Sequence, residues 1–253
     1  MDEKIIRLAQ ILKASDNIVF FGGAGVSTAS NIPDFRSAHG IFSRKLGAQL
    51  TPEQLVSHTM FVRYTDEFYD FYKKNLLYPD AEPNACHRAL AELERMGKLK
   101  AVVTQNIDGL HQAAGSSKVY ELHGSVYRNR CMECGKAFEM EYVYHADGIP
   151  HCTECGGLIK PDVVLYEEGL DQQVISGAVN AISAADTLII GGTSLVVYPA
   201  AGLIDYFRGN HLVLINKTVT SADKDADLVI NDDIASVMEQ ALRRLKEESG
   251  ARG

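Results

Sequence analysis

The sequence lacks an excess of positive charge, a long apolar run, an internal repeat and any low-complexity tract. Its 25 Lys and Arg residues stand against 33 Asp and Glu residues, which gives a formal net charge of −8. A general nucleic-acid-binding protein usually presents a basic face, so we expect no nucleic-acid partner. No apolar run approaches the roughly 20 residues of a membrane-spanning helix. We therefore also expect no membrane association.

The N-terminal segment lacks a signal peptide. Residues 1–17, MDEKIIRLAQILKASDN, contain neither an uninterrupted apolar core nor a small-residue cleavage site. Ile5, Leu8 and Leu12 fall on one helical face, which predicts a surface helix packed on a core. We expect a cytoplasmic protein, and the hydrophobic content of 46% is typical of a soluble globular chain.

Cysteine is scarce but strongly patterned. Four of the five cysteines form two C-x-x-C pairs with residues 135–151 between them, Cys131, Cys134, Cys152 and Cys155. In a chain without an export signal, this spacing indicates a structural zinc site rather than disulfides. The cysteine segment has few large apolar residues of its own, so we expect it to need the metal to fold.

Short apolar runs alternate with helical patterns along most of the chain. Strands are predicted at residues 18–21, 99–104, 118–122, 161–166, 187–190, 211–215 and 228–230. Because these runs are continuously apolar, they indicate an α/β fold with a doubly wound, Rossmann-like parallel sheet. We assign residues 1–41, 79–126 and 157–253 to this domain. A helical module at 42–78 and a zinc-ribbon module at 127–156 would form a smaller insertion domain.

Polar clusters follow five of the predicted strands: GGAGVS, TQNIDG, ELHGS, GGTS and INK. Ligands of doubly wound folds bind at the carboxyl ends of the strands, so the five clusters predict a single site. The first cluster has the glycines of a phosphate-binding loop. It is not the dehydrogenase fingerprint, because Thr28 stands at the third glycine and the loop runs into Pro33-Asp34-Phe35-Arg36.

Taken together, GAGVSTASNIPDFR, TQNIDGLH, ELHGS, the C-x-x-C pairs and GTSLVVYPAA resemble the sirtuin family of NAD-dependent protein lysine deacylases. The resemblance extends from about residue 18 to residue 232. It implies removal of acetyl, or other neutral acyl, groups from lysine side chains of acetylated proteins or peptides. It also implies NAD as a consumed co-substrate, release of nicotinamide and O-acyl-ADP-ribose, and a structural Zn²⁺ held by the four cysteines.

The resemblance assigns catalytic roles to three residues. His123 would be the general base, and its ordinary pKa of about 6.5 suits proton transfer near neutrality. A lone histidine is more often structural, and only its place in ELHGS favours catalysis. Asn106 would contact the ribose and Asp108 the nicotinamide carboxamide. The alternative is that Asn106 and Asp108 merely cap the helix starting at Leu110.

The remaining assignments concern the cofactor. Phe35 would shield the reacting ribose carbon, and Arg36 would face the pyrophosphate. The full cofactor-binding set that the resemblance implies is Gly23, Ala24, Gly25, Thr28, Asp34, Phe35, Arg36, Gln105, Asn106, Asp108, Gly192, Thr193, Ser194, Asn216 and Ile234.

The substrate peptide is expected to pair as a strand with the segment after residue 163. The implied peptide-binding residues are Val164, Tyr166, Glu167, Glu168 and Val197. Glu167 stands where the family commonly has glycine, and Asn31 replaces another family glycine. A carboxylate at position 167 predicts a preference for basic residues beside the acyl-lysine.

The acyl-group preference and two alternative functions remain to be considered. Tyr69-x-x-Tyr72 matches the Tyr-x-x-Arg pair of sirtuins that prefer acidic acyl groups, but without the arginine, so neutral acyl groups are favoured over succinyl. The same NAD chemistry could serve a protein ADP-ribosyltransferase. A non-catalytic NAD-binding or zinc-ribbon interaction module is a third reading, which the intact His123, Asn106 and Asp108 argue against.

Overall fold

The structure is a computed structural model that describes residues 1–34 and 50–250. Its larger lobe is built on a six-stranded, all-parallel sheet with the order β3-β2-β1-β7-β8-β9. The strands are β1 (Ile18–Gly22), β2 (Leu99–Thr104), β3 (Val119–Glu121), β7 (Thr187–Gly191), β8 (His211–Ile215) and β9 (Leu228–Ile230). Counted within the sheet, this is the 3-2-1-4-5-6 order of doubly wound dinucleotide-binding folds. The predicted Rossmann-like sheet is confirmed.

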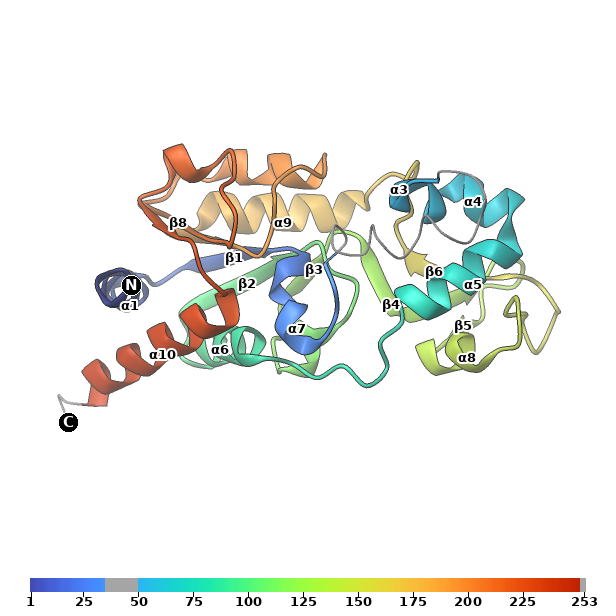
Figure 1. The fold of residues 1–253 in the computed structure, drawn as a ribbon, viewed down its shortest axis with the longest axis horizontal. Coiled ribbons are helices and arrows are strands. Elements are labelled where there is room, and N and C mark those ends of the chain that lie inside the picture. The colour runs from blue at the N-terminus through green and yellow to red at the C-terminus, as the bar shows by residue number, and fades with distance from the viewer. Residues whose placement is uncertain (35–49, 251–253) are drawn as a thin grey trace.

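Helices cover both faces of this sheet (Figure 1). One face carries α1 (Asp2–Ala14), α6 (Ala85–Arg95) and α10 (Ile234–Gly250), and the other carries α9 (Gln172–Ala184) and the 3-10 helix η3 (Ala200–Tyr206). Successive side chains of a strand point to opposite faces. Phe20 of β1 accordingly packs with α1, α6 and α10, whereas Phe21 packs with α9. Burial on both faces explains why the strands are continuously apolar.

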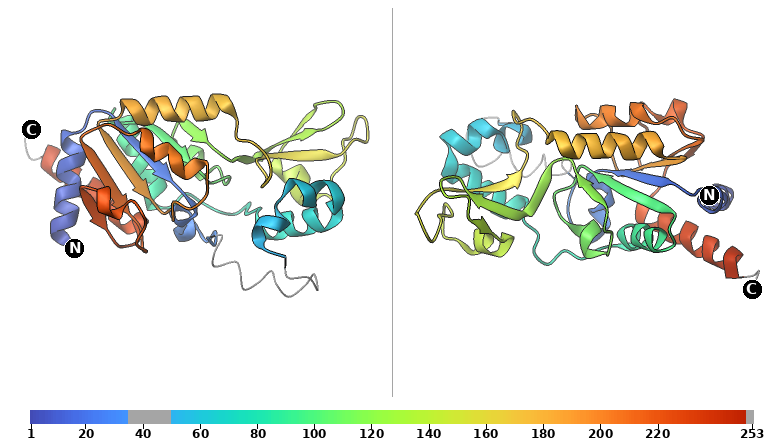
Figure 2. Two further views of the ribbon diagram at one scale, coloured as in Figure 1. Left: turned by 90° about the horizontal axis from the view of Figure 1, so that it is seen from above. Right: turned by 180° about the vertical axis from the view of Figure 1, so that it is seen from behind.

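A smaller lobe lies at one end of the elongated molecule (Figures 1 and 2). Its antiparallel sheet has the order β5-β4-β6. The elements of this lobe are β4 (Gly124–Cys131), β5 (Ala137–Phe138), β6 (Ile159–Val163), α3 (Pro52–Leu55), α4 (His58–Arg63), α5 (Thr65–Asn75) and α8 (Met140–His145).

One apolar cluster joins the two modules of the small lobe. Phe61 and Phe68 of the helical module belong to the same buried cluster as Phe138 and Val143 of the cysteine segment. The cysteine segment therefore does have an apolar core, and the aromatic helices supply most of it. The sequence shows the aromatic density at residues 61–77, but not which segment it covers.

The strand β6 lies in a different lobe from the one expected. The predicted boundaries place residues 157–166 in the larger domain, whereas β6 pairs with β4 and Ile159 and Val163 pack among the small-lobe aromatics. The predicted strand at 161–166 is also shifted, because β6 covers Ile159–Val163. We therefore propose the same division into two domains with residues 159–166 moved to the smaller one.

Short elements make the turns at the sheet edge. They are the 3-10 helices η1 (Ala24–Val26), η2 (Thr28–Ser30) and η4 (Asp223–Asp225), and the short helix α7 (Leu110–Ala113). Within the described residues, no helix combines the length and the apolar character needed to cross a membrane.

Candidate active site and zinc centre

The adjacent strands β1 and β7 lie at the point where the strand order of the sheet reverses. Their following loops run side by side, with η1 after β1 and the Gly192-Thr193 turn after β7. The loops after β2 and β3 arrive at the same edge. This is where doubly wound folds hold their ligands, as the polar clusters predict.

The glycines of the first loop allow close contact between two loops. The Gly25 N–H donates to the Gly192 carbonyl oxygen at 2.8 Å, and a Cβ on Gly25 would lie 2.8 Å from Gly192 Cα. Gly192 has a φ of +59°, and its Cβ would lie 2.4 Å from the Val26 nitrogen. We expected these glycines to bring N–H groups toward a ligand. In the structure the Gly25 N–H is instead bonded to the Gly192 carbonyl oxygen. The absence of Cβ atoms chiefly allows the loops after β1 and β7 to pack closely against each other.

A chain of hydrogen bonds links the first loop to the TQNIDG loop. Asn106 Nδ2 donates to Ser27 Oγ at 3.0 Å, and Ser27 Oγ donates to Asp108 Oδ2 at 2.6 Å. The other carboxylate oxygen accepts from the Leu110 N–H at 3.0 Å, so Asp108 also caps the turn as the structural alternative suggested. Desolvation raises the pKa of Asp108, and the Ser27 hydrogen bond opposes that rise.

Ser27 belongs to this hydrogen-bonded cluster, although the sequence analysis does not single it out. It is 1% exposed and joins Asn106 to Asp108, which are 79 and 81 residues away in the chain. The available signal was a hydroxyl residue inside the glycine loop. By contrast, the Thr28 hydroxyl, which we had assigned to the cofactor, donates to the Gly25 carbonyl within its own turn at 3.0 Å.

His123 is oriented by one hydrogen bond to the same loop. Its Nδ1 lies 2.9 Å from the carbonyl oxygen of Gln105. Because a carbonyl oxygen only accepts, Nδ1 carries the proton in the neutral ring and the Nε2 lone pair is left free. Burial lowers the pKa of His123, with the Gln105 hydrogen bond acting in the opposite direction. The ring is therefore neutral and basic at neutral pH.

Gly124 keeps this histidine at the junction of the two lobes. Its φ is +74°, and a Cβ there would lie 1.9 Å from the Asp162 carbonyl oxygen. The Val164 N–H in turn donates to the His123 carbonyl oxygen at 3.0 Å. The residue after the predicted base therefore has to be glycine for β6 to approach.

The other predicted cofactor residues differ in how they are placed. Gln105 Nε2 donates to Thr193 Oγ1 at 3.1 Å, which joins the loops after β2 and β7. Asn216 Nδ2 donates to the Thr218 carbonyl oxygen at 2.8 Å. Ile234 is 4% exposed and packs beneath Gly191 in the core. These side chains are thus partly engaged within the protein, and their contacts with a cofactor stay predictions.

Phe35 and Arg36 lie outside the described residues. Asp34 is the last described residue before them, and its side chain is half-buried. Ser194 is half-buried after the Gly192 turn.

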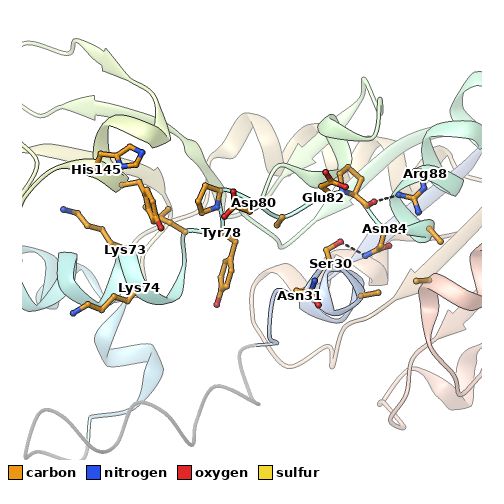
Figure 3. Close-up of a pocket in the computed structure, with 18 of the residues that line it drawn as sticks. Ser30, Asn31, Lys73, Lys74, Tyr78, Asp80, Glu82, Asn84, Arg88 and His145 are labelled. Carbon is orange, nitrogen blue, oxygen red and sulfur yellow. Dashed lines mark hydrogen bonds between the residues drawn. The ribbon is translucent and has the colours of Figure 1, made fainter.

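Asn84 connects the first loop to the start of α6 (Figure 3). Its Nδ2 donates to the Val26 carbonyl oxygen at 2.8 Å and to Ser30 Oγ at 3.0 Å, while its Oδ1 caps α6 by accepting from the Cys86 N–H. A groove of about 1290 Å³ opens on this side, along the connection between α5 and α6. Among the described residues, none of the predicted catalytic side chains lines it, so this groove is not the reaction site.

The predicted peptide-binding segment has only a few free backbone groups. The Tyr166 N–H donates to the Val56 carbonyl oxygen at 3.0 Å, and the Tyr166 carbonyl oxygen accepts from the His58 N–H at 2.9 Å. Within the described residues, the Val164 carbonyl oxygen and both backbone polar groups of Glu167 have no hydrogen-bond partner. Val164 and Glu167, rather than Tyr166, are therefore the positions able to pair with a peptide strand.

The two carboxylates of this segment bond within the small lobe. Glu167 Oε2 accepts from the Thr59 N–H at 2.8 Å and from Thr59 Oγ1 at 2.7 Å, and these bonds hold the pKa of Glu167 below its usual value. Glu168 accepts from the Leu165 N–H, and it pairs with Lys160 at 3.1 Å and with His58 at 2.9 Å.

The four cysteines of the C-x-x-C pairs converge as predicted. Their sulfur atoms all lie within 4.8 Å of one another, with Cys131 and Cys155 Sγ 3.4 Å apart and Cys134 and Cys152 Sγ 3.6 Å apart. Four ligands at the usual Zn–S distance of about 2.3 Å would be about 3.8 Å apart, so the cluster fits zinc. Cys131 and Cys152 are buried, whereas Cys134 and Cys155 are exposed to solvent.

Glycines shape both turns of this zinc centre. Gly135 and Gly156 each follow a C-x-x-C pair with a φ of +74°. Each donates its N–H to the carbonyl oxygen of the first cysteine of its pair, at 3.0 Å from Gly135 to Cys131 and 2.9 Å from Gly156 to Cys152.

The Tyr69-x-x-Tyr72 pair lies in the interior of the small lobe. Tyr69 is 1% exposed and donates its hydroxyl to the Ile159 carbonyl oxygen, and Tyr72 is fully buried in a stack on Phe68. Burial raises the pKa of both hydroxyl groups, so both side chains are neutral. Neither offers a cation to an acidic acyl group.

Comparison with known proteins agrees with this geometry. A family model described as the Sir2 family matches residues 23–199. A protein of Clostridium perfringens named NAD-dependent protein deacetylase is 65% identical over 239 residues, which cover 94% of this chain and 98% of that protein. A protein of Clostridium acetobutylicum with the same name is 59% identical and covers 95% of this chain and 98% of its own.

Solved structures of Sir2 enzymes are similar over nearly the whole chain. One, from work on the mechanism and regulation of Sir2 enzymes, superposes with a TM-score of 0.89 at 38% identity and covers 99% of this chain and 100% of its own. A Sir2 homologue in complex with NAD has a TM-score of 0.87 at 36% identity, with 96% and 94% covered. A Sir2 variant with a deacetylated p53 peptide and 3′-O-acetyl ADP-ribose has a TM-score of 0.84 at 37% identity, with 97% and 98% covered.

Proposed function

The chain belongs to the Sir2 family, and from this membership we infer that it is an NAD-dependent protein-lysine deacetylase. It removes acetyl groups from lysine side chains of acetylated proteins, consumes NAD, and releases nicotinamide and O-acyl-ADP-ribose. Within the structure, the observation that carries this function is the convergence of His123 with the Asn106–Ser27–Asp108 chain on one loop.

The residues present fit NAD. The loops after β1 and β7 form a glycine-lined turn at the switch point, and amide, hydroxyl and carboxylate groups face one another beside it. Bound NAD would supply an electrophilic ribose carbon for the acyl oxygen and nicotinamide as the leaving group. Asn106, Ser27 and Asp108 would orient the ribose and the nicotinamide carboxamide. Thr193 and Gln105 would line the neighbouring part of the cofactor.

His123 would act as the base. Its Nε2 carries the free lone pair, and the Gln105 carbonyl stabilises the charge that the ring gains when it takes a proton from a ribose hydroxyl. A Gln105 carbonyl bonded to Nδ1 also prevents the ring from turning. The zinc centre would be structural rather than catalytic, because four thiolates complete a tetrahedral site and leave no open coordination position.

The substrate peptide would add as a strand at Val164 and Glu167, whose free backbone groups support this pairing. The Glu167 carboxylate has two candidate roles, and attraction of basic residues beside the acetyl-lysine is the first of them. It is supported by Glu167 Oε1, which has no hydrogen-bond partner among the described residues, although Oε2 is held by Thr59. A cytoplasmic location also belongs to this proposal, and it is supported by four cysteines that are arranged as zinc ligands rather than as disulfides.

A stoichiometry assay tests the function. The purified protein should release one nicotinamide for each acetyl group removed from an acetyl-lysine peptide, only when NAD is present, and mass spectrometry should detect O-acetyl-ADP-ribose. An ADP-ribosylated protein without deacetylation would indicate the transferase alternative instead. Peptide binding with no nicotinamide release would favour the non-catalytic module.

A further inference from the structure

Glu167 has a backbone conformation that is unusual for its residue type. Its φ is +76°, in the left-handed region that glycine and asparagine adopt most readily. Among the described non-glycine residues, only Asn31 and Leu195 share a positive φ. Glu167 is also the position whose N–H and C=O remain free for a peptide strand. Its conformation therefore sets the direction of those two groups.

The side chain of Glu167 is tied to the segment that begins α4. Oε2 accepts two hydrogen bonds from Thr59, at 2.8 Å from the backbone nitrogen and 2.7 Å from the hydroxyl. The preceding residue is tied to the same segment, because Tyr166 forms a parallel bridge with Ser57. Figure 1 shows the connection between β6 and α9 passing beside α3 and α4. Backbone and side chain thus hold position 167 from the same side.

We propose that Thr59 and Glu167 form a clasp that positions the peptide-binding edge, with the Glu167 carboxylate acting through Thr59 rather than on the substrate. This inference rests on the proposed deacetylase function. The clasp keeps the Glu167 backbone in the left-handed conformation, in which its N–H and C=O face the incoming strand. Without the clasp, a non-glycine residue at this position relaxes toward negative φ and the edge is lost.

A second explanation of Glu167 makes different predictions. If the carboxylate acted by attracting basic residues of the peptide, removal of its charge would weaken only basic peptides. The clasp needs an acceptor but not a charge. Glu167→Gln retains an acceptor oxygen for Thr59, whereas Glu167→Ala retains neither the acceptor nor the charge.

The experiment measures KM and kcat for two acetyl-lysine peptides, one with alanine and one with lysine beside the acetyl-lysine. Glu167→Ala should raise the peptide KM about 5- to 10-fold for both, which is what loss of a pair of hydrogen bonds to a charged group produces. KM for NAD and kcat should change less than about twofold, because only peptide binding depends on the edge. Glu167→Gln should recover most of the affinity for both peptides.

Variants of the partner complete the test. Thr59→Val removes the hydroxyl donor and keeps the N–H, so its peptide KM should rise by about threefold. Combined with Glu167→Ala it should add nothing further, because the two residues act as one unit. Glu67→Ala removes an exposed carboxylate elsewhere in the small lobe and should leave all constants unchanged.

Four outcomes would overturn the clasp. They are an unchanged peptide KM in Glu167→Ala, a loss confined to the lysine-flanked peptide, Glu167→Gln behaving like Glu167→Ala, and additive effects of the two partners. An equal rise of the NAD KM with a lowered melting temperature would also overturn it, since that pattern indicates general damage. Absence of NAD-dependent deacetylation by the unaltered protein would overturn the proposed function first, which the wild-type assay reports separately.

Discussion

At the scale of single residues, one hydrogen bond fixes the orientation of the proposed base His123. The Gln105 carbonyl fixes the tautomer, and burial keeps the ring neutral. Glu121 and Gly124 on either side hold the loop, the first through Arg128 at 2.7 Å and the second by its close approach to Asp162. Neither Glu121 nor Gly124 offers a group that could take over the proton-accepting role proposed for His123 Nε2.

Replacement of this base is the first prediction. His123→Ala should lower kcat/KM for deacetylation by at least about 100-fold, because general base catalysis contributes about that much or more. The measurement is steady-state deacetylation of an acetyl-lysine peptide. NAD affinity and far-UV circular dichroism should stay close to those of the unaltered protein. Retention of more than a tenth of the activity would remove His123 from the role of base.

The pH profile of the unaltered enzyme is the second prediction. In the proposed mechanism His123 acts in its neutral form, and burial lowers the pKa at which it gains a proton. Activity should therefore be nearly complete at pH 7 and fall as the pH decreases through values below about 6.5, the ordinary histidine pKa. kcat/KM measured between pH 5 and 8 checks this. An acid limb centred above pH 7 would contradict it.

At the scale of elements, the packing of α6 on α7 buries two histidines against each other. The rings of His87 and His111 lie 4.7 Å apart, and each side chain is at most 1% exposed. His87 Nδ1 accepts from the Asn84 N–H and so completes the cap of α6. Within the described residues, His87 Nε2 and both ring nitrogens of His111 have no hydrogen-bond partner. Either ring would be costly to charge in place.

Acid sensitivity of folding is the third prediction. Burial lowers the pKa of His87 to about 4 and that of His111 to about 3, whereas both return to about 6.5 on unfolding. The unfolded chain therefore binds more protons below pH 6.5, and stability present above that pH is lost as the pH falls toward 4. The loss should be about 2 kcal/mol per histidine at pH 5.

Urea denaturation at pH 5, 6 and 7 measures this loss. His111→Phe keeps an aromatic ring beside Phe20 and removes one titrating group, so it should reduce the pH dependence between pH 5 and 7 by about half. A variant with the same pH dependence as the unaltered protein would show that the histidine pair is not the cause.

At the scale of the whole molecule, the small lobe depends on both metal and aromatic helices. The zinc-bearing strands and α5 share one apolar cluster, so neither module has a core without the other. The fourth prediction is that chelation of zinc, or Cys134→Ser, unfolds the small lobe together with its aromatic helices and abolishes deacetylation. The six-stranded sheet belongs to separate clusters and should keep most of its circular dichroism.

Tyrosine fluorescence provides a direct readout, because the chain has 11 tyrosines and no tryptophan. Tyr69 and Tyr72 lie in the shared cluster and should become solvent-exposed when the metal leaves. Metal analysis should first establish that the zinc has been removed completely. If the tyrosine fluorescence and the melting curve are then unchanged, the small lobe does not depend on the metal.

The sequence by itself determined the parallel sheet, the edge that carries the site and the cysteine cluster. These follow from local patterns: apolar runs report burial, polar loops after strands report an edge, and C-x-x-C spacing reports ligand geometry. Only the tertiary structure decided that β6 joins the small lobe, that Ser27 links Asn106 to Asp108, and that the Glu167 carboxylate bonds to Thr59. Each of these depends on a partner 28 or more residues distant in the chain. Periodicity along a chain shows that a side chain is buried, but it does not identify the segment that buries it.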